Sequence, residues 1–303
     1  MRACTTKTTK TATKAHVTAK TAAACGSVAG TLGALCGVGG GLVIIPVLKQ
    51  FSKLTVHQIT ATSLFSITIA SSVGAASYVA QGQARVPEAG LIALSAMTTA
   101  GLGAKVSQRM PAASLTKLLA LTMMLSVPAV LLKSPSIATI DGKEQNGGAN
   151  AILDASETTS SVTKDFAYYM GKSAPSSMAE VPDWFRTNCG YSILGLFVGF
   201  SSSLLGIGGG IVMTTYMSVA TDLTQHEAVA TSLVAMVPTG LSATFWHMRA
   251  GNVQTRAALM IGGSCAVAMY GAATHIAPHV SEATMRKIFA AVLGVASLKM
   301  LLP

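Results

Sequence analysis

Charge is what this sequence has least of. Only 11% of its 303 residues are charged, whereas roughly a quarter are charged in an ordinary soluble domain, and no acidic residue precedes Glu88. Half of the residues are hydrophobic, and aromatic residues make up only 5%. This composition excludes an ordinary soluble domain and predicts an all-α integral membrane protein that crosses the bilayer several times.

Metal-binding and disulfide patterns are absent as well. The five cysteines are scattered without Cys-x-x-Cys or Cys/His spacing, which predicts packing residues, no metal site, no cofactor and no disulfide framework: Cys4, Cys25, Cys36, Cys189 and Cys265. The net charge of +10 is half contained in the first twenty residues and otherwise spread over loops. Attraction to the anionic headgroups of a lipid bilayer accounts for it, and nucleic acid is not an expected partner.

One segment occurs twice. Residues 37 to 41 have the sequence Gly-Val-Gly-Gly-Gly, and 169 residues later 206 to 210 have Gly-Ile-Gly-Gly-Gly. His57, followed by Ala-Thr-Ser-Leu at 61 to 64, returns as His226, followed by Ala-Thr-Ser-Leu at 230 to 233. The repetition predicts two copies of one unit in a single chain.

Long apolar runs define the expected membrane helices, since about 20 residues of helix cross the hydrocarbon core. Five runs are strong, and three shorter ones contain or adjoin basic residues that can extend to the headgroups. The strong runs are Ala22 to Leu48, Gln58 to Ala84, Thr187 to Thr221, Ala228 to Met248 and Ala257 to Met285; the weaker ones are Ala89 to Ala104, Leu118 to Leu132 and Met285 to Leu302. We therefore expect about eight transmembrane helices.

Four spans per copy would make the two repeats parallel, with both termini and the connector on one side of the membrane. The expected domains are a basic tail (1–21), a first four-helix repeat (22–133), a hydrophilic flexible connector (134–186) and a second repeat (187–303). Basic residues are divided almost evenly between the two sides, so they do not orient the chain. A plasma membrane is preferred, with an organelle-targeting tail as the alternative. Another copy of the chain, in a homo-oligomer, is a further candidate partner beside the lipid bilayer.

The glycine clusters predict interrupted helices, because so many glycines disfavour a continuous helix. Backbone freed by an interruption needs a protein or water partner, which favours a cavity; close helix packing through small residues is the alternative. Amide groups at the start of a resumed helix suit an anion. The candidate substrate-binding glycines are Gly37, Gly39, Gly40, Gly41, Gly206, Gly208, Gly209 and Gly210.

The duplicated polar residues also belong to the candidate site. His57 and His226 either cap helices near the membrane boundary or add switchable positive charge beside an anion pathway. Hydroxyl groups either donate to the anion or bond back to their own helix. The hydroxyl candidates are Thr62, Ser63, Thr231 and Ser232. Because the first copy departs further from the shared pattern, we expect changes at His57 and Ser63 to reduce anion affinity less than changes at His226 and Ser232.

These motifs together resemble the sulfite exporter TauE/SafE family. The resemblance rests on the glycine break in each half, on His-x-Ala-x-x-Thr-Ser-Leu at 226 to 233, and on Gly-Asn-Val at 251 to 253, and it extends from about Gly26 to Leu302. It implies a membrane transporter, expected to export sulfite, organosulfonates or related sulfur-containing anions. The first copy departs from it, since Gln-Ile follows His57.

Two other classes of function are alternatives. An intramembrane serine hydrolase could draw on Ser63, Ser77 or Ser232 with His57, His226 or His247, but a duplicated Ser and His pair does not suit an enzyme that needs one nucleophile and one base. A non-transporting membrane assembly factor is the other alternative. We expect no enzyme. No carboxylate lies well inside a predicted span, which favours potential-assisted or histidine-coupled export.

Overall fold

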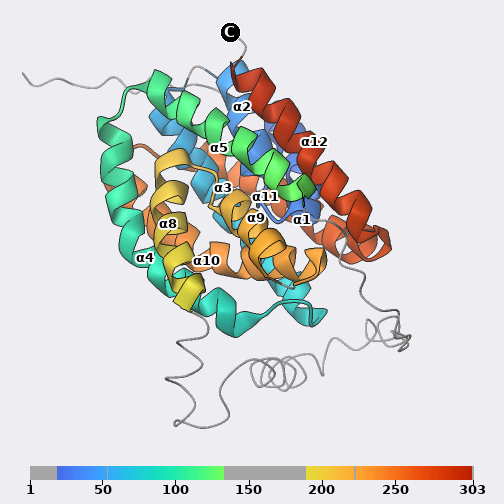
Figure 1. Cartoon of the computed structure of the whole chain (residues 1–303). Helices are drawn as coiled ribbons and strands as arrows, with labels where there is room; N and C mark the ends of the chain where they lie inside the picture. Colours follow the sequence, from blue (N-terminus) through green and yellow to red (C-terminus); the bar gives the residue numbers. More distant parts are fainter. Residues whose placement is uncertain (1–18, 53, 133–188, 222, 302–303) are drawn as a thin grey trace, which may run out of the picture.

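A computed structural model describes residues 19–52, 54–132, 189–221 and 223–301. Throughout these ranges the chain is helical and forms no strand (Figure 1). Most of the basic tail and the whole of the connector at 134–186 lie outside the described residues. The predicted all-helical class is confirmed.

The helices follow the predicted apolar runs. The first half contains α1 (Ala19–Cys36), α2 (Gly41–Phe51), α3 (Val56–Ala80), α4 (Val86–Arg109) and α5 (Ala112–Leu132). The second half contains α8 (Cys189–Leu205), α9 (Gly210–Ala220), α10 (Gln225–Arg249), α11 (Thr255–Gly271), the short turns η1 (Ala272–Ile276) and η2 (Ala277–His279), and α12 (Glu282–Leu301). Four helical stretches are long and apolar enough to cross a membrane: α3, α4, α10, and α11 continued to His279.

Capping boxes start the two longest helices at equivalent places. The Thr55 hydroxyl accepts the amide of Gln58 before α3, and the Thr224 hydroxyl accepts the amide of Glu227 before α10. The Gln58 and Glu227 side chains each accept the amide of the capping threonine in return. These reciprocal bonds satisfy backbone donors that a helix start otherwise leaves free, so the sequence fixes where both helices begin.

The glycine breaks reverse the direction of the chain. Gly40 has a φ of +84° and precedes α2, and a Cβ atom on it would lie 2.8 Å from the carbonyl oxygen of Ala29 in α1. The far end of α2 returns to the beginning of α1, where Thr21 and Phe51 line one shallow hollow. Hence α1 and α2 form a hairpin. In the second half, the hydroxyl of Tyr216 in α9 lies beside Gly190 at the start of α8, so α8 and α9 form another.

Two faces of the molecule follow from these hairpins. We call the face where α1 begins, α2 ends and α3 begins the terminal face; α12 also ends there (Figure 1). The connector face is the opposite one, where α5 ends and α8 begins. The termini of the described chain thus share one face, as predicted, whereas the segments flanking the connector end at the other.

The prediction of parallel repeats is wrong, because α3 and α10 are antiparallel. The backbone amide of Arg85, just after α3, donates to Thr231 in the second turn of α10. At the opposite ends, the amide of Gln254, just after α10, donates to Thr62 in the second turn of α3. The first apolar run of each half, counted from the sequence as one span, folds back as a hairpin, which leaves three further helices per half: α3, α4 and α5, and α10, α11 and α12. An odd number inverts the second copy.

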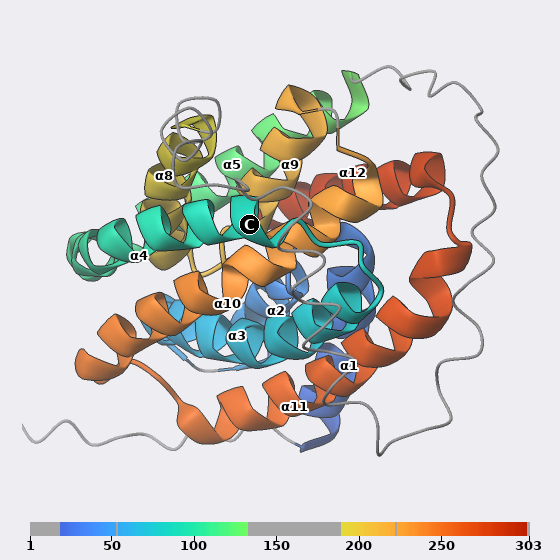
Figure 2. The same cartoon turned by 90° about the horizontal axis from the view of Figure 1, so that it is seen from below.

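The two halves exchange helices. α1 packs beside α11, and α8 packs beside α4, so each hairpin is held by the other half. Gly26 and Gly30 lie against the backbone of α11 around Cys265, and Gly195 and Gly199 lie in the same way against α4. Small residues allow this close approach. α3 and α10 lie side by side between these pairs, with α5 and α12 packed together on another side (Figure 2).

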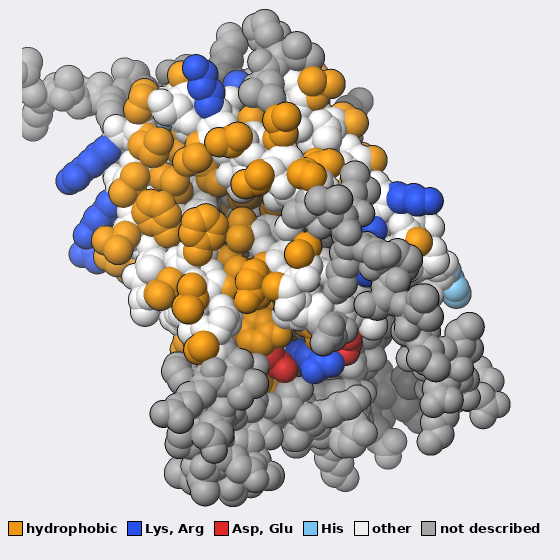
Figure 3. All heavy atoms as spheres, viewed as in Figure 1, with side chains coloured by type: hydrophobic (Ala, Val, Ile, Leu, Met, Phe, Trp, Pro, Cys, Tyr) orange, Lys and Arg blue, Asp and Glu red, His pale blue; other side chains and the backbone are white. Residues whose placement is uncertain are grey.

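The outer surface is apolar over the sides of the helices. Figure 3 shows hydrophobic side chains over α4, α5 and α8, with Lys and Arg toward the edges of the view. Phe197 of α8, Leu94 of α4 and Leu125 of α5 are each more than half exposed. An apolar belt bounded by basic residues is the surface expected of a protein surrounded by lipid. This chain is an integral membrane protein.

Candidate functional site: the facing glycine breaks

Each break is a buried turn that only glycine adopts easily. Gly37, Gly39 and Gly40 have φ between +62° and +84°, and Gly206, Gly208 and Gly209 have φ between +73° and +80°. All of residues 37 to 41 and 206 to 210 are buried. A Cβ atom is disfavoured in this left-handed region by about 1–2 kcal/mol. The predicted interruption is therefore present in both halves, with the same conformation.

The two breaks face each other at the centre of the molecule. A Cβ on Gly41 would lie 3.2 Å from the Cα of Ile207, and one on Gly210 would lie 2.8 Å from the Cα of Val38. The facing arrangement predicted from the repeat is confirmed. The facing breaks lie level with the middle of α3 and α10. Ile67, in the middle of α3, and Met236, in the middle of α10, are the residues that reach Gly39 and Gly208.

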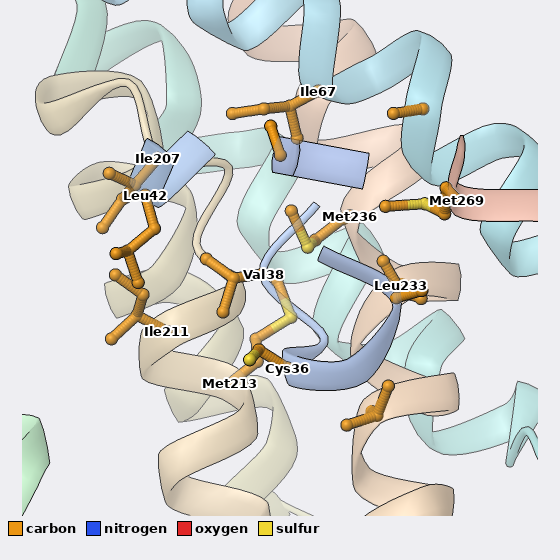
Figure 4. Close-up of a cluster of buried hydrophobic side chains, with 14 of the residues drawn as sticks. Cys36, Val38, Leu42, Ile67, Ile207, Ile211, Met213, Leu233, Met236 and Met269 are labelled. Carbon is orange, nitrogen blue, oxygen red and sulfur yellow. The ribbon is translucent and has the colours of Figure 1, made fainter. Parts of the chain in front are cut away.

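Apolar side chains fill the space between the breaks. Ile67 of α3 and Met236 of α10 are repeat counterparts, and both approach Gly39 and Gly208 (Figure 4). Both are almost completely buried. The cavity predicted at the breaks is thus occupied by side chains in this conformation. The glycines allow close packing as well as a turn, so the two alternatives considered from the sequence are not exclusive.

Backbone donors are concentrated around this apolar centre. The amides of residues 38–42 and 207–211 have no hydrogen-bond acceptor within the described chain. They include the first amides of α2 and α9, whose positive dipole ends both point toward the centre. Buried amides without acceptors are rare in proteins. Two such groups meeting at one point form an environment suited to an anion.

Ser63 and Ser232 hold the breaks together across the two halves. The Ser63 hydroxyl donates to the carbonyl oxygen of Gly206 (2.9 Å), and the Ser232 hydroxyl reaches the carbonyl oxygen of Gly37 (3.0 Å). The Thr214 hydroxyl lies 3.4 Å from that same Gly37 oxygen. Because these hydroxyls bind the first carbonyl of each break, they fix its position. Their predicted role as donors to substrate stays a prediction.

Thr62 and Thr231 have a matching role nearer the two faces. Each hydroxyl accepts one backbone amide from the loop that follows the long helix of the other half: Gln254 to Thr62 at 3.2 Å, and Arg85 to Thr231 at 3.0 Å. Both threonines are fully buried. The duplicated Thr-Ser pair therefore works as a unit, in which Thr binds a loop and Ser binds a break of the opposite half.

His57 and His226 lie in the first turns of α3 and α10 and are partly buried. Neither caps its helix through its side chain, since Thr55 and Thr224 do so. The Nδ1 atom of each ring is buried and has no hydrogen-bond partner in the described residues. The structure thus brings the candidate glycines together with Ser63 and Ser232 at the centre, and leaves Thr62, Thr231 and the two histidines nearer the faces.

Sequence reasoning missed the residues that differ between the copies. Ile67 and Met236 occupy the centre, yet nothing in either residue type suggested a site. Tyr78 and His247 make equivalent bonds to the two hairpins, and the sequence comparison did not identify them as counterparts. The constant offset of 169 residues could have found both pairs, because it identifies equivalent positions whether or not the residues are identical.

The described residues contain no arrangement of side chains typical of a serine hydrolase or of a metal site. Ser63 and Ser232 bond to carbonyl oxygens, Ser77 bonds back to Val73, and none of the three is hydrogen-bonded to a histidine there. Clusters of three or more His, Cys, Asp or Glu that could hold a metal ion do not occur among the described residues.

Inverted halves, interrupted helices and a buried anion-suited centre define a membrane transporter. The family model described as sulfite exporter TauE/SafE matches residues 22–300, and the chain belongs to this family. Two proteins of Bacillus subtilis (strain 168) are similar to it. The probable membrane transporter protein YunE is 24% identical over 78% of this chain and 80% of its own. The probable membrane transporter protein YdhB is 33% identical over 26% of this chain and 30% of its own. No solved structure matches the chain.

Proposed function

We propose that this protein exports a small sulfur-containing anion, such as sulfite or an organosulfonate, across the plasma membrane. The observation that carries the proposal is the meeting of α2 and α9 at the centre, where their first amides have no acceptor in the described chain. The substrate class is supported by the description of the family, since backbone amides alone select for negative charge rather than for sulfur.

The proposed membrane arrangement has three crossings per half, formed by α3, α4 and α5 and by α10, α11 and α12. Each half adds one hairpin that enters from one face and returns to it. The first hairpin enters from the terminal face and the second from the connector face. Substrate would reach the shared centre from either side by separation of one hairpin from the opposite half.

Transport requires the centre to open, because Ile67 and Met236 occupy the position that an anion would take. Both are side chains that can change rotamer, and Met is the more adaptable of the two. Movement of these two residues away from Gly39 and Gly208 would expose amides to the anion. The membrane potential then supplies a driving force of about 2.3 kcal/mol per charge per 100 mV for exit from a negative interior.

Replacement of Gly208 by Val tests the site. The branched side chain meets Met236 at about 2.5 Å from its Cβ and must adopt a φ of +73°, so we expect Gly208→Val to abolish flux of radiolabelled sulfite from proteoliposomes. Gly263→Val is the matched control. Gly263 is an exposed helical glycine with open space around it, and this variant should keep wild-type flux.

The outcome is decided by flux at equal amounts of reconstituted protein. Normal flux through Gly208→Val would remove the glycine breaks as the site. A panel of sulfite, sulfate, sulfoacetate and taurine, tested first by thermal shift and then by flux, identifies the substrate class. Flux of none of the sulfur-containing compounds through active wild-type protein would contradict the proposed substrate.

A further inference from the structure

His247 is a completely buried histidine with half of its hydrogen-bonding capacity unused. It lies in the last turn of α10, and its Nε2 lies 2.9 Å from the carbonyl oxygen of Ser203. A carbonyl oxygen only accepts, so Nε2 carries the hydrogen and the neutral ring has its lone pair on Nδ1. That Nδ1 is buried without a partner in the described chain. Ser203 is three residues before Gly206, at the break of the second hairpin.

Tyr78 makes the equivalent bond in the other half. Its hydroxyl donates to the carbonyl oxygen of Ala34 at 2.9 Å, and Ala34 is three residues before Gly37. Tyr78 is also completely buried. The two side chains therefore hold the two hairpins by the same bond at equivalent positions. They differ in one property: a phenol keeps one proton at physiological pH, whereas an imidazole can take a second.

We propose that Nδ1 of His247 is a proton-binding site that links proton uptake to opening of the terminal face. The inference rests on the proposed transport function. A proton from water on the terminal side adds to the Nδ1 lone pair and forms an imidazolium, while the Nε2 hydrogen stays on Ser203. The same proton leaves Nδ1 for water at the end of the cycle, so no other reactant is needed.

Burial explains why the proton opens the structure. An imidazolium in the closed conformation has a charge without a counterion and an Nδ1 hydrogen without an acceptor, and both are costly inside a protein. Conformations that bring water or an anion to Nδ1 relieve both costs. His247 binds Ser203 close to the glycine break of the second hairpin. Separation of the hairpin from protonated His247 would therefore leave a cation beside the anion-suited centre. A proton and an anion would then be accommodated together.

Few charged groups face His247 from the helices packed against α10. His57, in the first turn of α3, is close enough to act on it electrostatically. On α4, the Lys105 ammonium lies 5.5 Å from the ring centre of the adjacent Trp246. α8 and α9 contain no charged residue or histidine, and α12 has Glu282, Arg286 and Lys287 in its first turns, toward the other face. The helix ends at the terminal face hold further basic residues: Arg249 of α10, Arg109 of α4, Lys299 of α12 and Lys20 of α1. No carboxylate from these described elements neutralises the imidazolium.

The decisive variant is His247→Tyr, which gives the second half the residue that the first half already uses. It keeps a hydrogen-bond donor and removes the second proton. In proteoliposomes, we expect wild-type sulfite flux to rise roughly fivefold as the pH on the terminal side falls from 8 to 6, after correction for the protonation of sulfite itself. His247→Tyr should transport with a change below about twofold.

Tyr78→Phe is the matched control. It removes the bond to Ala34 but adds no titrating group, so its pH profile should follow that of wild type even if its flux is lower. If His247→Tyr does not fold, thermal unfolding of His247→Gln in detergent replaces it. The unfolding temperature of wild type should fall between pH 8 and pH 6, because the buried ring must gain a charge, and that of His247→Gln should fall less.

The two proposals fail differently. Flux with the same pH profile in wild type and His247→Tyr would overturn the proton site and leave the transporter intact, and so would equal pH effects on unfolding in wild type and His247→Gln. Absence of anion flux in wild type at every pH would contradict the proposed function itself.

Discussion

The two faces of the molecule are closed by the same backbone bond and by different side chains. At the connector face, the Arg85 guanidinium pairs with Glu227 at 3.4 Å, beside the bond from the Arg85 amide to Thr231. At the terminal face, the equivalent positions are Gln254 and Gln58; the Gln58 side chain bonds to the Thr55 amide, and the described residues show no bond from it to Gln254. We call Arg85 with Glu227 the ionic latch, and Gln254 with Gln58 the neutral latch.

The comparison separates what an inverted repeat must share from what it can vary. The Thr hydroxyls and loop amides set the geometry at both faces, because their bonds are almost identical in length. The ionic latch adds attraction at one face alone. Both of its side chains are partly exposed, at 43% and 30%, so the pair stabilises closure by no more than about 1 kcal/mol. That suffices to favour closure of one face over the other by several fold.

The largest difference between the halves should appear on removal of the central serines. Ser63 is the one described donor to the Gly206 carbonyl, whereas the Gly37 carbonyl has Thr214 near it as well as Ser232. Ser63→Ala should therefore leave a buried carbonyl unpaired and cost about 1–3 kcal/mol. Ser232→Ala should cost less. This order of destabilisation is opposite to the order that the sequence predicts for losses of anion affinity.

Thermal unfolding in one detergent measures that difference. Ser77→Ala is the control, since Ser77 bonds only within its own helix, to Val73. Equal decreases for Ser63→Ala and Ser232→Ala would show that Thr214 does not substitute for Ser232.

Neutralising the ionic latch should have a moderate effect. Arg85→Gln with Glu227→Gln makes the connector face resemble the terminal face, and it should shift closure by about 1 kcal/mol at most, or up to about fivefold in population. Cysteines placed at Gln83 and at its counterpart Asn252 report on the two faces, in a background without native cysteines. The double variant should increase maleimide labelling at position 83 and leave position 252 unchanged. Increased labelling at both would contradict a latch specific to one face.

The reverse exchange should act at the terminal face with a smaller effect. Gln58→Glu with Gln254→Arg installs charges at the neutral latch, where Ala257 stands at the position equivalent to Glu88, the second partner of Arg85. We expect labelling at position 252 to fall by about twofold, within the range measured for exposed ion pairs. No change at position 252, with normal expression, would show that charge alone does not close this face.

Salt should give the smallest effect. Raising the ionic strength from about 0.05 to 1 M shortens the screening length from more than 10 Å to about 3 Å and weakens exposed pairs. Labelling at position 83 should increase by less than about twofold in wild type and remain constant in the Arg85→Gln, Glu227→Gln variant. A salt effect of equal size in that variant would assign it to another charge.

Local features of the fold could be predicted from the sequence. Apolar runs gave the helix positions, and the capping pair at Thr224 and Glu227 agrees with the start of α10. The breaks were predictable because glycine acts on its own backbone. The hairpin was not, because a run such as 22 to 48 is long enough to cross the membrane once. The left-handed Gly40 and its contact with Ala29 show the reversal, and both require the structure.

The candidate site was predictable where the copies are identical. Ser63 and Thr62 were found through duplication, but their partners lie in the opposite half, and no local pattern shows a contact between residues more than a hundred positions apart. His247 was missed as a counterpart of Tyr78 because identity guided the comparison. The two halves differ chemically at equivalent positions that hold different residue types. Such positions are recognised when the structure shows that the two residues make the same contact.

The hairpins also change how basic residues are divided between the two sides. Helix ends at the terminal face carry Lys49, Lys105, Arg109, Lys117, Arg249 and Arg256, and those at the connector face carry Arg85, Arg286 and Lys287. Counting each hairpin as a crossing places several of these residues on the other side and makes the division nearly even. For the described residues, the positive-inside rule predicts that the terminal face lies in the cytoplasm or its equivalent. An anion leaving the cell would then pass the imidazole of His247 first and the Arg85–Glu227 pair last.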